Sequence, residues 1–520
     1  MKNKIVIISV LLIFALTSCK DFLNEVPKHN WAIENAMDSH EKAVQAINGI
    51  YARIAPGDAL NMELSAYLVS ASGLIWINNA YSMDFMEANT PSGPWNTAYS
   101  GINSANLAVN GIPLIADSSF PSLTVKNELL GEARFMRGYL HSKILLHYCR
   151  WYDPDDSPYG ILRRDETSDV KNAYLSRITV GESWKFILED IDAGIDNMAG
   201  FSTPRRASKE FAKAYKARLL LYRGHINNNM ADLNEAKNLV TDVLNNLPSA
   251  LRMEPDMANM YAKAWDNTEN LFVRYLENNG NRTANAGWNC TNGPVVQTAN
   301  TNRVSVVPYE DATCGLRYGL DIVKNDPRWT VVTGAARQPD MGNDYESWAF
   351  TKVYRKGNYA GMNATPRDEN YAVYHMRLPE LYIMQAELIA RTGGSSAEAI
   401  APINTMRAKR THPVLPPVPV PVSAQDLMDA IFWEWICELI YENGSEFYAS
   451  IRFEKNGKKQ MELAREAYGI ADFSFADRKD WLQFPIPGGE MNNNYHLYLT
   501  EEDEDGKLVV ITDMQNPRQK

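Results

Sequence analysis

The residue with the clearest predicted chemistry is Cys19, a thiol that follows a short apolar run. The chain begins with Lys2 and Lys4, and residues 5–16 are then apolar except for Ser9. That run is shorter than the roughly 20 residues that span a bilayer, so residues 1–18 are predicted to be a secretory signal peptide. The sequence LTSC that ends at Cys19 fits the bacterial lipobox. We therefore expect cleavage before Cys19 and its acylation, which makes a stable lipid anchor; an ordinary signal peptide with a chance cysteine is the alternative.

The other four cysteines fall into two pairs with different expected roles. Cys149 and Cys437 lie in apolar, helix-like stretches and are predicted to be buried packing residues. Cys290 and Cys314 lie in a loop-rich region, where an oxidising compartment would permit a disulfide; the sequence leaves their pairing open. No CxxC pair occurs.

Motifs for catalysis are absent from the sequence, and we expect neither an enzyme nor a bound metal or cofactor. No segment matches GxSxG, HExxH, GxGxxG or the phosphate-binding lysine loop. His141 and His147 are six residues apart and are interpreted as packing or surface residues. A carboxylate pair for glycoside hydrolysis stays open, because 63 acidic residues always offer some pair.

Aromatic side chains are the most prominent candidates for ligand contact. The chain has 12 Trp, 26 Tyr and 16 Phe, and many of them fall in segments rich in Asn, Gly, Ser and Thr. Such rings either stack on a ligand or pack the loops onto the core. Residues 19–520 carry 50 basic and 63 acidic side chains, a net charge of −13. This charge disfavours nucleic acid as a partner.

The elements that position these rings are mainly helices, at both ends of the chain. Apolar residues recur at helical spacing in 39–54, 95–112, 125–148, 179–198, 208–223, 233–247, 377–391, 396–410 and 424–442. Thr179 and Glu182 predict a capping box at the start of one of these helices. Between residues 270 and 374 the periodicity fades, and short β-like runs such as 350–354 predict hairpins. A further hairpin is predicted in the tail, around Asp505-Gly506.

Consecutive predicted helices form pairs: 95–112 with 125–148, 208–223 with 233–247, and 377–391 with 396–410. The fold class is therefore mainly α, a tetratricopeptide-like helical superhelix with a loop-rich insert of small β-hairpins. The expected parts are 19–270 (helical), 271–375 (irregular and ligand-binding), 376–480 (helical) and 481–520 (tail). Residues 413–421 (PVLPPVPVP) cannot be helical and predict a stiff, extended connector; recognition by an aromatic groove is the alternative.

Short blocks along the whole chain, in order, resemble the RagB/SusD family of nutrient-binding outer-membrane lipoproteins. Its mature start is similar to residues 19–27 (CKDFLNEVP), and its Ala-rich helix to residues 206–222. The other matching blocks are 131–139 (GEARFMRGY), the positions Arg177, Glu182, Ile187, Asp190 and Ala193, 377–387 (RLPELYIMQAE), 403–407, 484–487 (FPIP) and 515–517 (QNP).

One block departs from the family pattern. Glu434, Glu438 and Gly444 are kept. The family usually has Arg, Arg and Asp at three other positions, where this chain has Trp435, Glu446 and Ala449. We interpret the family's charges as a buried structural network. The replacements therefore predict altered packing in this chain.

The resemblance implies a lipid-anchored protein on the outer face of the outer membrane. It implies pairing with a SusC-like TonB-dependent transporter and capture of oligosaccharides for import, or of oligopeptides as the alternative. A glycan-active enzyme is the less favoured reading, and a pure helical scaffold the third.

Ligand-binding positions are not part of the shared blocks, so candidates come from this chain alone. Trp76 and Tyr81 flank an Asn pair, Trp288 lies between Gly and Asn, and Tyr345 and Trp348 lie near Asp344. Each ring is expected either to contact ligand or to pack on the core.

Overall fold

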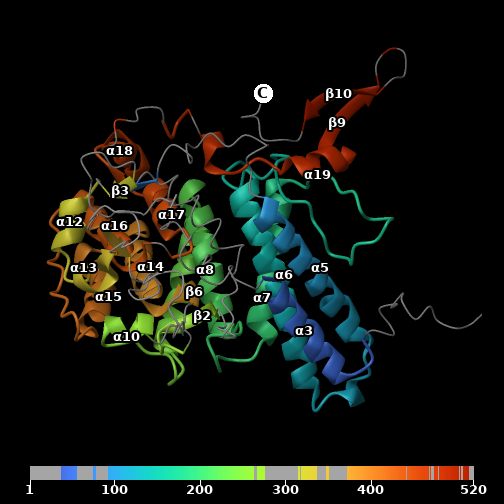
Figure 1. Ribbon diagram of the computed structural model, residues 1–520, viewed down its shortest axis with the longest axis horizontal. Helices are drawn as coiled ribbons and strands as arrows, with labels where there is room; N and C mark the ends of the chain where they lie inside the picture. The colour runs from blue at the N-terminus through green and yellow to red at the C-terminus, as the bar shows by residue number, and fades with distance from the viewer. Residues whose placement is uncertain are drawn as a thin grey trace, which may run out of the picture.

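The computed structural model describes residues 37–54, 74–77, 92–262, 266–275, 314–316, 318–336, 347–350, 372–440, 442–467, 469, 474–477, 479–502, 504 and 508–513. These residues form a mainly helical protein with five two-stranded antiparallel sheets (Figure 1). The predicted class, helices with small β-hairpins, is confirmed. Several predicted residues lie outside the described residues: the expected lipidation residue Cys19, the ring candidates Tyr81, Trp288 and Tyr345, and Cys290.

The N-terminal lobe is built from long helices whose apolar stripes face one another. It comprises α3 (His40–Ile54), α5 (Ser92–Gly111), α6 (Leu123–Tyr148) and α7 (Val180–Asn197), which lie together on the right of Figure 1. The predicted stripe of α3 is buried at Ala43, Ile47 and Ile50. Helix α6 lies at the centre of this lobe and is buried on nearly every side of its second half.

The predicted capping box fixes the start of α7. The Thr179 hydroxyl oxygen accepts a hydrogen bond from the Glu182 backbone N–H at 3.1 Å. The Glu182 carboxylate accepts one from the Thr179 N–H at 2.9 Å. Two backbone donors that the helix itself cannot use are satisfied in this way.

Helices α6 and α7 approach closely because glycine lies on the contact face. A Cβ on Gly138 would lie 2.9 Å from the Asp190 Cβ and 3.0 Å from the Ile187 carbonyl oxygen. The missing side chain therefore brings Asp190 next to α6, where its carboxylate accepts hydrogen bonds from Arg137 at 2.7 and 2.9 Å.

The predicted helix pairs are present. Helix α5 packs on α6, α8 (Lys209–Ile226) on α9 (Met230–Asn245), and α14 (Leu378–Arg391) on α15 (Ser396–Ala408). Helices α9 and α14 also contact each other, so the second and third pairs are continuous. Helix α8 lies between the N-terminal and C-terminal lobes (Figure 1).

The predicted helix 424–442 is too long. Helix α16 (Ala424–Leu439) ends earlier, because Ile440 leaves the helical conformation with a ψ of 138°. Asn443 and Gly444 then take positive φ angles of 55° and 69° and turn the chain. A new helix, α17 (Ser445–Arg452), begins directly after Gly444. The prediction stopped before Asn443-Gly444 and overran the helix end by three residues.

The sheets join segments that are far apart in the sequence. Strand β2 (Asn270–Tyr275) pairs with β6 (Ala372–Arg377), and β1 (Ile75–Ile77) pairs with β3 (Cys314–Leu316). The other sheets join β4 (Thr333–Ala336) to β5 (Ser347–Phe350), β7 (Glu454–Lys455) to β8 (Lys458–Lys459), and β9 (Tyr498–Glu502) to β10 (Leu508–Asp513). The last is the predicted tail hairpin, which projects from the body (Figure 1).

Short helices complete the described chain and were not predicted. They are α10 (Met257–Ala262), α12 (Leu320–Asn325), α13 (Trp329–Val332), α18 (Gln460–Ala467) and α19 (Gly488–Asn493). Helices this short show too few turns for a recurring apolar stripe. The predicted strand at 350–354 is described only at Phe350, the last residue of β5.

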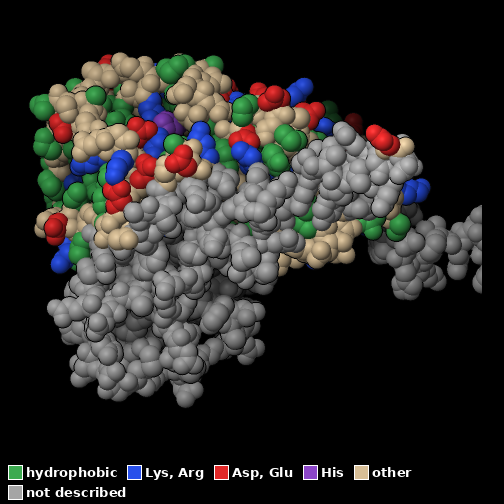
Figure 2. Space-filling view, turned by 90° about the horizontal axis from the view of Figure 1, so that it is seen from above, with side chains coloured by type: hydrophobic (Ala, Val, Ile, Leu, Met, Phe, Trp, Pro, Cys, Tyr) green, Lys and Arg blue, Asp and Glu red, His purple; other side chains and the backbone are tan. Residues whose placement is uncertain are grey.

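The surface mixes charges of both signs. In Figure 2, acidic and basic side chains alternate over the coloured part of the upper face, with hydrophobic side chains between them. None of the helices in the described ranges combines the length and apolar character needed to cross a membrane. The same ranges hold no group of three His, Cys, Asp or Glu side chains suited to a metal ion.

Candidate functional site

Two of the predicted ring residues lie on strands of the small sheets. Trp76 is the middle residue of β1, opposite Gly315 of β3. Trp348 lies on β5, opposite Ala335 of β4. Cys314 lies on β3 opposite Ile77.

Both sheets extend from one continuous stretch of chain. Strand β3 ends at residue 316 and β4 begins at residue 333, and the residues between them carry α12 and α13. We call residues 318–332 the anchor segment, because it packs on α16. The anchor segment thus fixes the start of β4 and the end of β3, and through them the strands that carry Trp348 and Trp76.

A buried arginine attaches the anchor segment to the helical body. Arg328 is 1% exposed and bonds Glu434 of α16 through Nη1 at 2.7 Å and Glu438 at 3.1 Å. It also donates from Nε to Asp326 of its own segment at 2.8 Å. Burying this charge is tolerated because each of its nitrogens meets a carboxylate.

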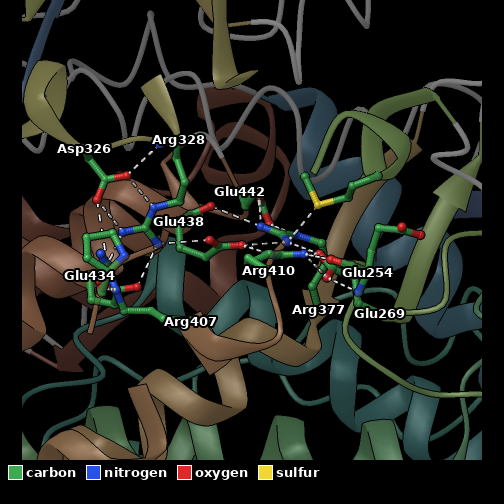
Figure 3. Close-up of polar contacts among 12 residues, drawn as sticks. Glu254, Glu269, Asp326, Arg328, Arg377, Arg407, Arg410, Glu434, Glu438 and Glu442 are labelled. Atoms are coloured by element: carbon green, nitrogen blue, oxygen red, sulfur yellow. Dashed lines mark hydrogen bonds and ion pairs between the residues drawn. The ribbon is translucent and has the colours of Figure 1, made fainter. Parts of the chain in front are cut away.

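The same carboxylates extend the network across the C-terminal lobe (Figure 3). Arg407 of α15 bonds Glu434 at 2.8 Å, and Arg410 bonds Glu438 at 2.8 Å and Glu269 at 2.7 Å. Arg377, at the end of β6, bonds Glu269, Glu438 and Glu442 at 2.5, 3.1 and 2.7 Å. The network therefore joins the anchor segment, α15, α16 and the β2–β6 sheet.

Electrostatics keep these groups charged despite their burial. Burial alone would lower the pKa of the Arg328 guanidinium, but Glu434 and Asp326 outweigh it and raise that pKa well above its ordinary value. Burial would likewise raise the pKa of Asp326, yet its bonds to Arg328 lower it. The mutual attraction of Arg328 and Asp326 thus favours their charged forms and gives this contact a structural role.

An aromatic pair lies where the anchor segment meets α16. The rings of Tyr318 and Trp433 have centroids 5.7 Å apart, tilted by 37°, and both side chains are half-buried. Gly319, at φ +71°, lies so close to Trp433 that a Cβ would be 1.8 Å from the indole Cη2. The Tyr318 hydroxyl donates to Gln460 of α18. Burial, aided by Asp429, raises the pKa of Tyr318 to about 12, so the hydroxyl stays a donor at neutral pH.

Sequence reasoning missed this pair. Trp433 lies in a helix that is apolar on nearly all sides. Its sequence neighbours therefore do not indicate which face is buried and which ring is partly exposed. Tyr318 lies outside the polar runs that directed attention to Trp76, Tyr81, Trp288, Tyr345 and Trp348. The useful signal was local: Tyr318 is followed by Gly319, whose positive φ and lack of a side chain permit the close contact.

The predicted buried network around Glu434 and Glu438 is present, and the packing beside it accommodates Trp435. Its indole N–H donates to Glu387 of α14 at 2.9 Å. Arg452 and Arg391 bond the same carboxylate at 3.0 and 2.8 Å. Arg452 also lies over the Trp435 ring, 5.2 Å from its centroid. A tryptophan at this position thus keeps a hydrogen bond to Glu387 while two arginines supply the charge.

Comparisons with known proteins agree with this architecture. The family model described as starch-binding and associating with the outer membrane matches residues 21–221, and the SusD family model matches residues 259–501. The chain is 24% identical to SusD-like protein P2 of Formosa agariphila, over 94% of this chain and 97% of the relative.

Solved structures share the fold. A SusD superfamily protein from Bacteroides thetaiotaomicron superposes with a TM-score of 0.63 at 19% identity, covering 88% of this chain and 98% of that one. Surface glycan-binding protein A from Bacteroides uniformis superposes with a TM-score of 0.63 at 17% identity, covering 88% of this chain and 99% of that one.

The chain belongs to the SusD/RagB family, as a distant member. Proteins of this family bind their targets and are not enzymes, in accordance with the lack of catalytic motifs in the sequence. The description of the N-terminal family model indicates association with the outer membrane.

Proposed function

We propose that this protein captures oligosaccharides at the cell surface and delivers them to a SusC-like TonB-dependent transporter in the outer membrane. Cys19 carries its lipid anchor. The observation that supports the capture site most directly is the half-buried Tyr318–Trp433 pair. Tyr318 lies two residues after β3, the strand that pairs with the Trp76 strand β1.

Ring faces suit a sugar because its axial C–H groups form an apolar face, while its hydroxyls need polar partners. The proposed ligand contacts are Trp76 and Trp348 on their strands, Tyr81, Trp288 and Tyr345 beyond the described residues, and the Tyr318–Trp433 pair. The charged network holds the anchor segment rigid, which lowers the entropic cost of ordering these rings on binding. Surface glycan-binding protein A of Bacteroides uniformis, whose fold this chain shares, supports the choice of ligand class.

Calorimetric titration of residues 20–520 with a panel of oligosaccharides tests the proposal. We expect at least one glycan to bind, and Trp433→Ala to weaken that binding by about tenfold or more. Trp433→Phe retains a ring and should reduce the affinity less. Tyr174→Ala, at an exposed aromatic elsewhere (46% exposed), serves as the matched control. Binding heat with oligopeptides and none with any glycan would show that the ligand is a peptide. Slow release of a cleavage product from a glycan would contradict a purely binding role.

Pairing with the transporter needs a separate test. Affinity purification of the tagged full chain from outer membranes should recover a TonB-dependent transporter in stoichiometric amount. Recovery of the chain without such a barrel protein would contradict the proposed partner while leaving glycan capture intact.

A further inference from the structure

Residues 413–421, the proline strap, join α15 to α16 in an extended form with no helix or strand from 415 to 421. The predicted absence of helix is confirmed. Burial along the strap recurs every third residue: Leu415 is buried, Val418 packs on the core, and Pro421 is half-buried. Three residues per turn is the repeat of a polyproline helix. One face of the strap is thus fixed to the body, and two faces point outward.

The strap is held in place along its length. Asn404 of α15 accepts from the Val418 N–H at 2.7 Å and donates to the Val418 carbonyl at 2.9 Å. Arg407, itself bonded to Glu434 of the charged network, donates to the Pro416 carbonyl at 2.8 Å. Just before the strap, the Thr411 N–H bonds Pro255 at 2.8 Å. A plain connector needs no such fixation, whereas a preformed binding segment gains affinity from it.

The outward faces are apolar and exposed. Val414, Val420 and Val422 are 71%, 56% and 97% exposed, and Pro416, Pro417 and Pro419 are exposed as well. Among the described residues, nine large hydrophobic side chains are exposed, and three of them fall within residues 414–422. Such a concentration of apolar side chains marks a contact surface more often than chance exposure.

We propose that the proline strap is a docking site for a second protein that presents a groove lined by Trp or Tyr side chains. Proline has no N–H, so the strap offers few hydrogen-bond donors and suits rings that pack between its side chains. Exposed charges flank it with opposite signs, Lys409 before it and Asp426 after it. The partner groove therefore carries an acidic group at the Lys409 end, which sets the direction of binding.

A second copy of this chain is a poorer occupant. Among the described residues, Tyr174 is the single aromatic of the large exposed hydrophobics, so they present no second ring for such a groove. The strap also lies on the α15 side of the C-terminal lobe, remote from the projecting β9–β10 hairpin (Figure 1). The site is independent of the Tyr318–Trp433 pair, so its test does not depend on glycan binding.

Photocrosslinking of the full chain in intact cells tests the docking site. A photoreactive amino acid is placed at Val420 or Val422, and at Val170 as a control of matched exposure (93%). We expect a light-dependent adduct with another protein at positions 420 and 422, and none at 170. The crosslinked peptide of that protein should contain Trp or Tyr. No adduct, an adduct with a second copy, a peptide without aromatic residues, or equal labelling at 170 would overturn the proposal.

The identified protein is then purified and titrated with the full chain. The triple change Val414→Ser, Val420→Ser and Val422→Ser should weaken binding by about tenfold or more. Lys409→Glu should weaken it separately, more at low salt than at high salt. Val170→Ser should leave it unchanged. All variants alter exposed side chains, and equal thermal unfolding midpoints confirm that they fold. Undiminished binding of the triple variant would also refute the site.

Discussion

Arg328 shows how one side chain determines the position of several distant ones. Its guanidinium meets Asp326 in the anchor segment and Glu434 and Glu438 on α16, with almost no exposure to water. The attraction within such a cluster compensates for burial only while every member is present. Loss of the arginine leaves buried carboxylates without their counter-charge.

Arg328→Ala should therefore reduce the free energy of unfolding by about 3–5 kcal/mol, measured by denaturant titration. The matched control is Arg205→Ala, because Arg205 pairs with Asp266 at 2.7 Å where the two side chains are 37% and 68% exposed. That change should cost at most about 1 kcal/mol. Similar losses for the two variants would mean that the buried network contributes no more than a surface ion pair.

Glu387 predicts a distinct acid sensitivity. Burial would raise its pKa, but Arg452 and Arg391 outweigh burial and lower the pKa to about 2. A carboxylate with a depressed folded-state pKa stabilises the protein above its unfolded pKa, and that stabilisation disappears as pH falls from about 4.5 to about 2. The loss amounts to about 3 kcal/mol over this window.

Glu387→Gln should remove that part of the pH dependence, so that the stability of the variant falls less steeply below pH 4.5 in urea titrations at a series of pH values. Glu398→Gln, at the exposed capping box of α15, should retain the steep fall. If the Glu387→Gln variant loses stability below pH 4.5 as steeply as the wild type, other groups cause the acid sensitivity.

Helix packing in the N-terminal lobe depends on where glycine lies. Gly138 has no room for a methyl group against α7, whereas nothing lies within 4 Å of a Cβ on Gly49 in α3. Gly138→Ala should destabilise the protein by about 1–3 kcal/mol through overpacking. Gly49→Ala should stabilise it by about 0.5–1 kcal/mol, because alanine favours the helix. Thermal unfolding midpoints that move in the same direction for both variants would refute this account.

Helices with a full apolar stripe and a recognisable cap could be predicted from the sequence. Thr179 and Glu182 gave the start of α7, and the stripe of α3 gave its buried face. The end of α16 was placed three residues too late, at 442, because the apolar residues Ile440 and Tyr441 continue the helical pattern beyond Leu439. The anchor segment escaped prediction for another reason: its position depends on Arg328 meeting Glu434, 106 residues later. Local patterns contain no information on such pairings.

The candidate site was predictable only in kind. The sequence indicated rings in polar loops, and two of them, Trp76 and Trp348, lie on strands that pair with the two strands flanking the anchor segment. The Tyr318–Trp433 pair required the packing of two segments that are remote in sequence. A ring in an apolar helix becomes a candidate contact only when the surrounding structure leaves part of it uncovered.

For the molecule as a whole, the proposed lipid anchor predicts where the protein is found in the cell. Cys19→Ala should prevent acylation and shift the protein from the outer-membrane fraction to the soluble fraction, measured by immunoblotting of separated fractions. Cys149→Ala, at a buried thiol, is the matched cysteine control and should stay with the membrane. Membrane association that survives the change at position 19 would contradict the predicted anchor.

The pairing of Tyr275 with Ala372 at the end of the β2–β6 sheet has a consequence for how such proteins diversify. The segment between Tyr275 and Ala372 therefore starts and ends at paired positions of one sheet, and its anchor segment packs on α16. Insertions, deletions or wholesale exchange between those two points leave the connections of the surrounding helices unaltered. Evolution can therefore remodel this excursion to suit new targets, and protein engineers can graft a relative's version, provided that the arginine that fastens it to α16 is retained.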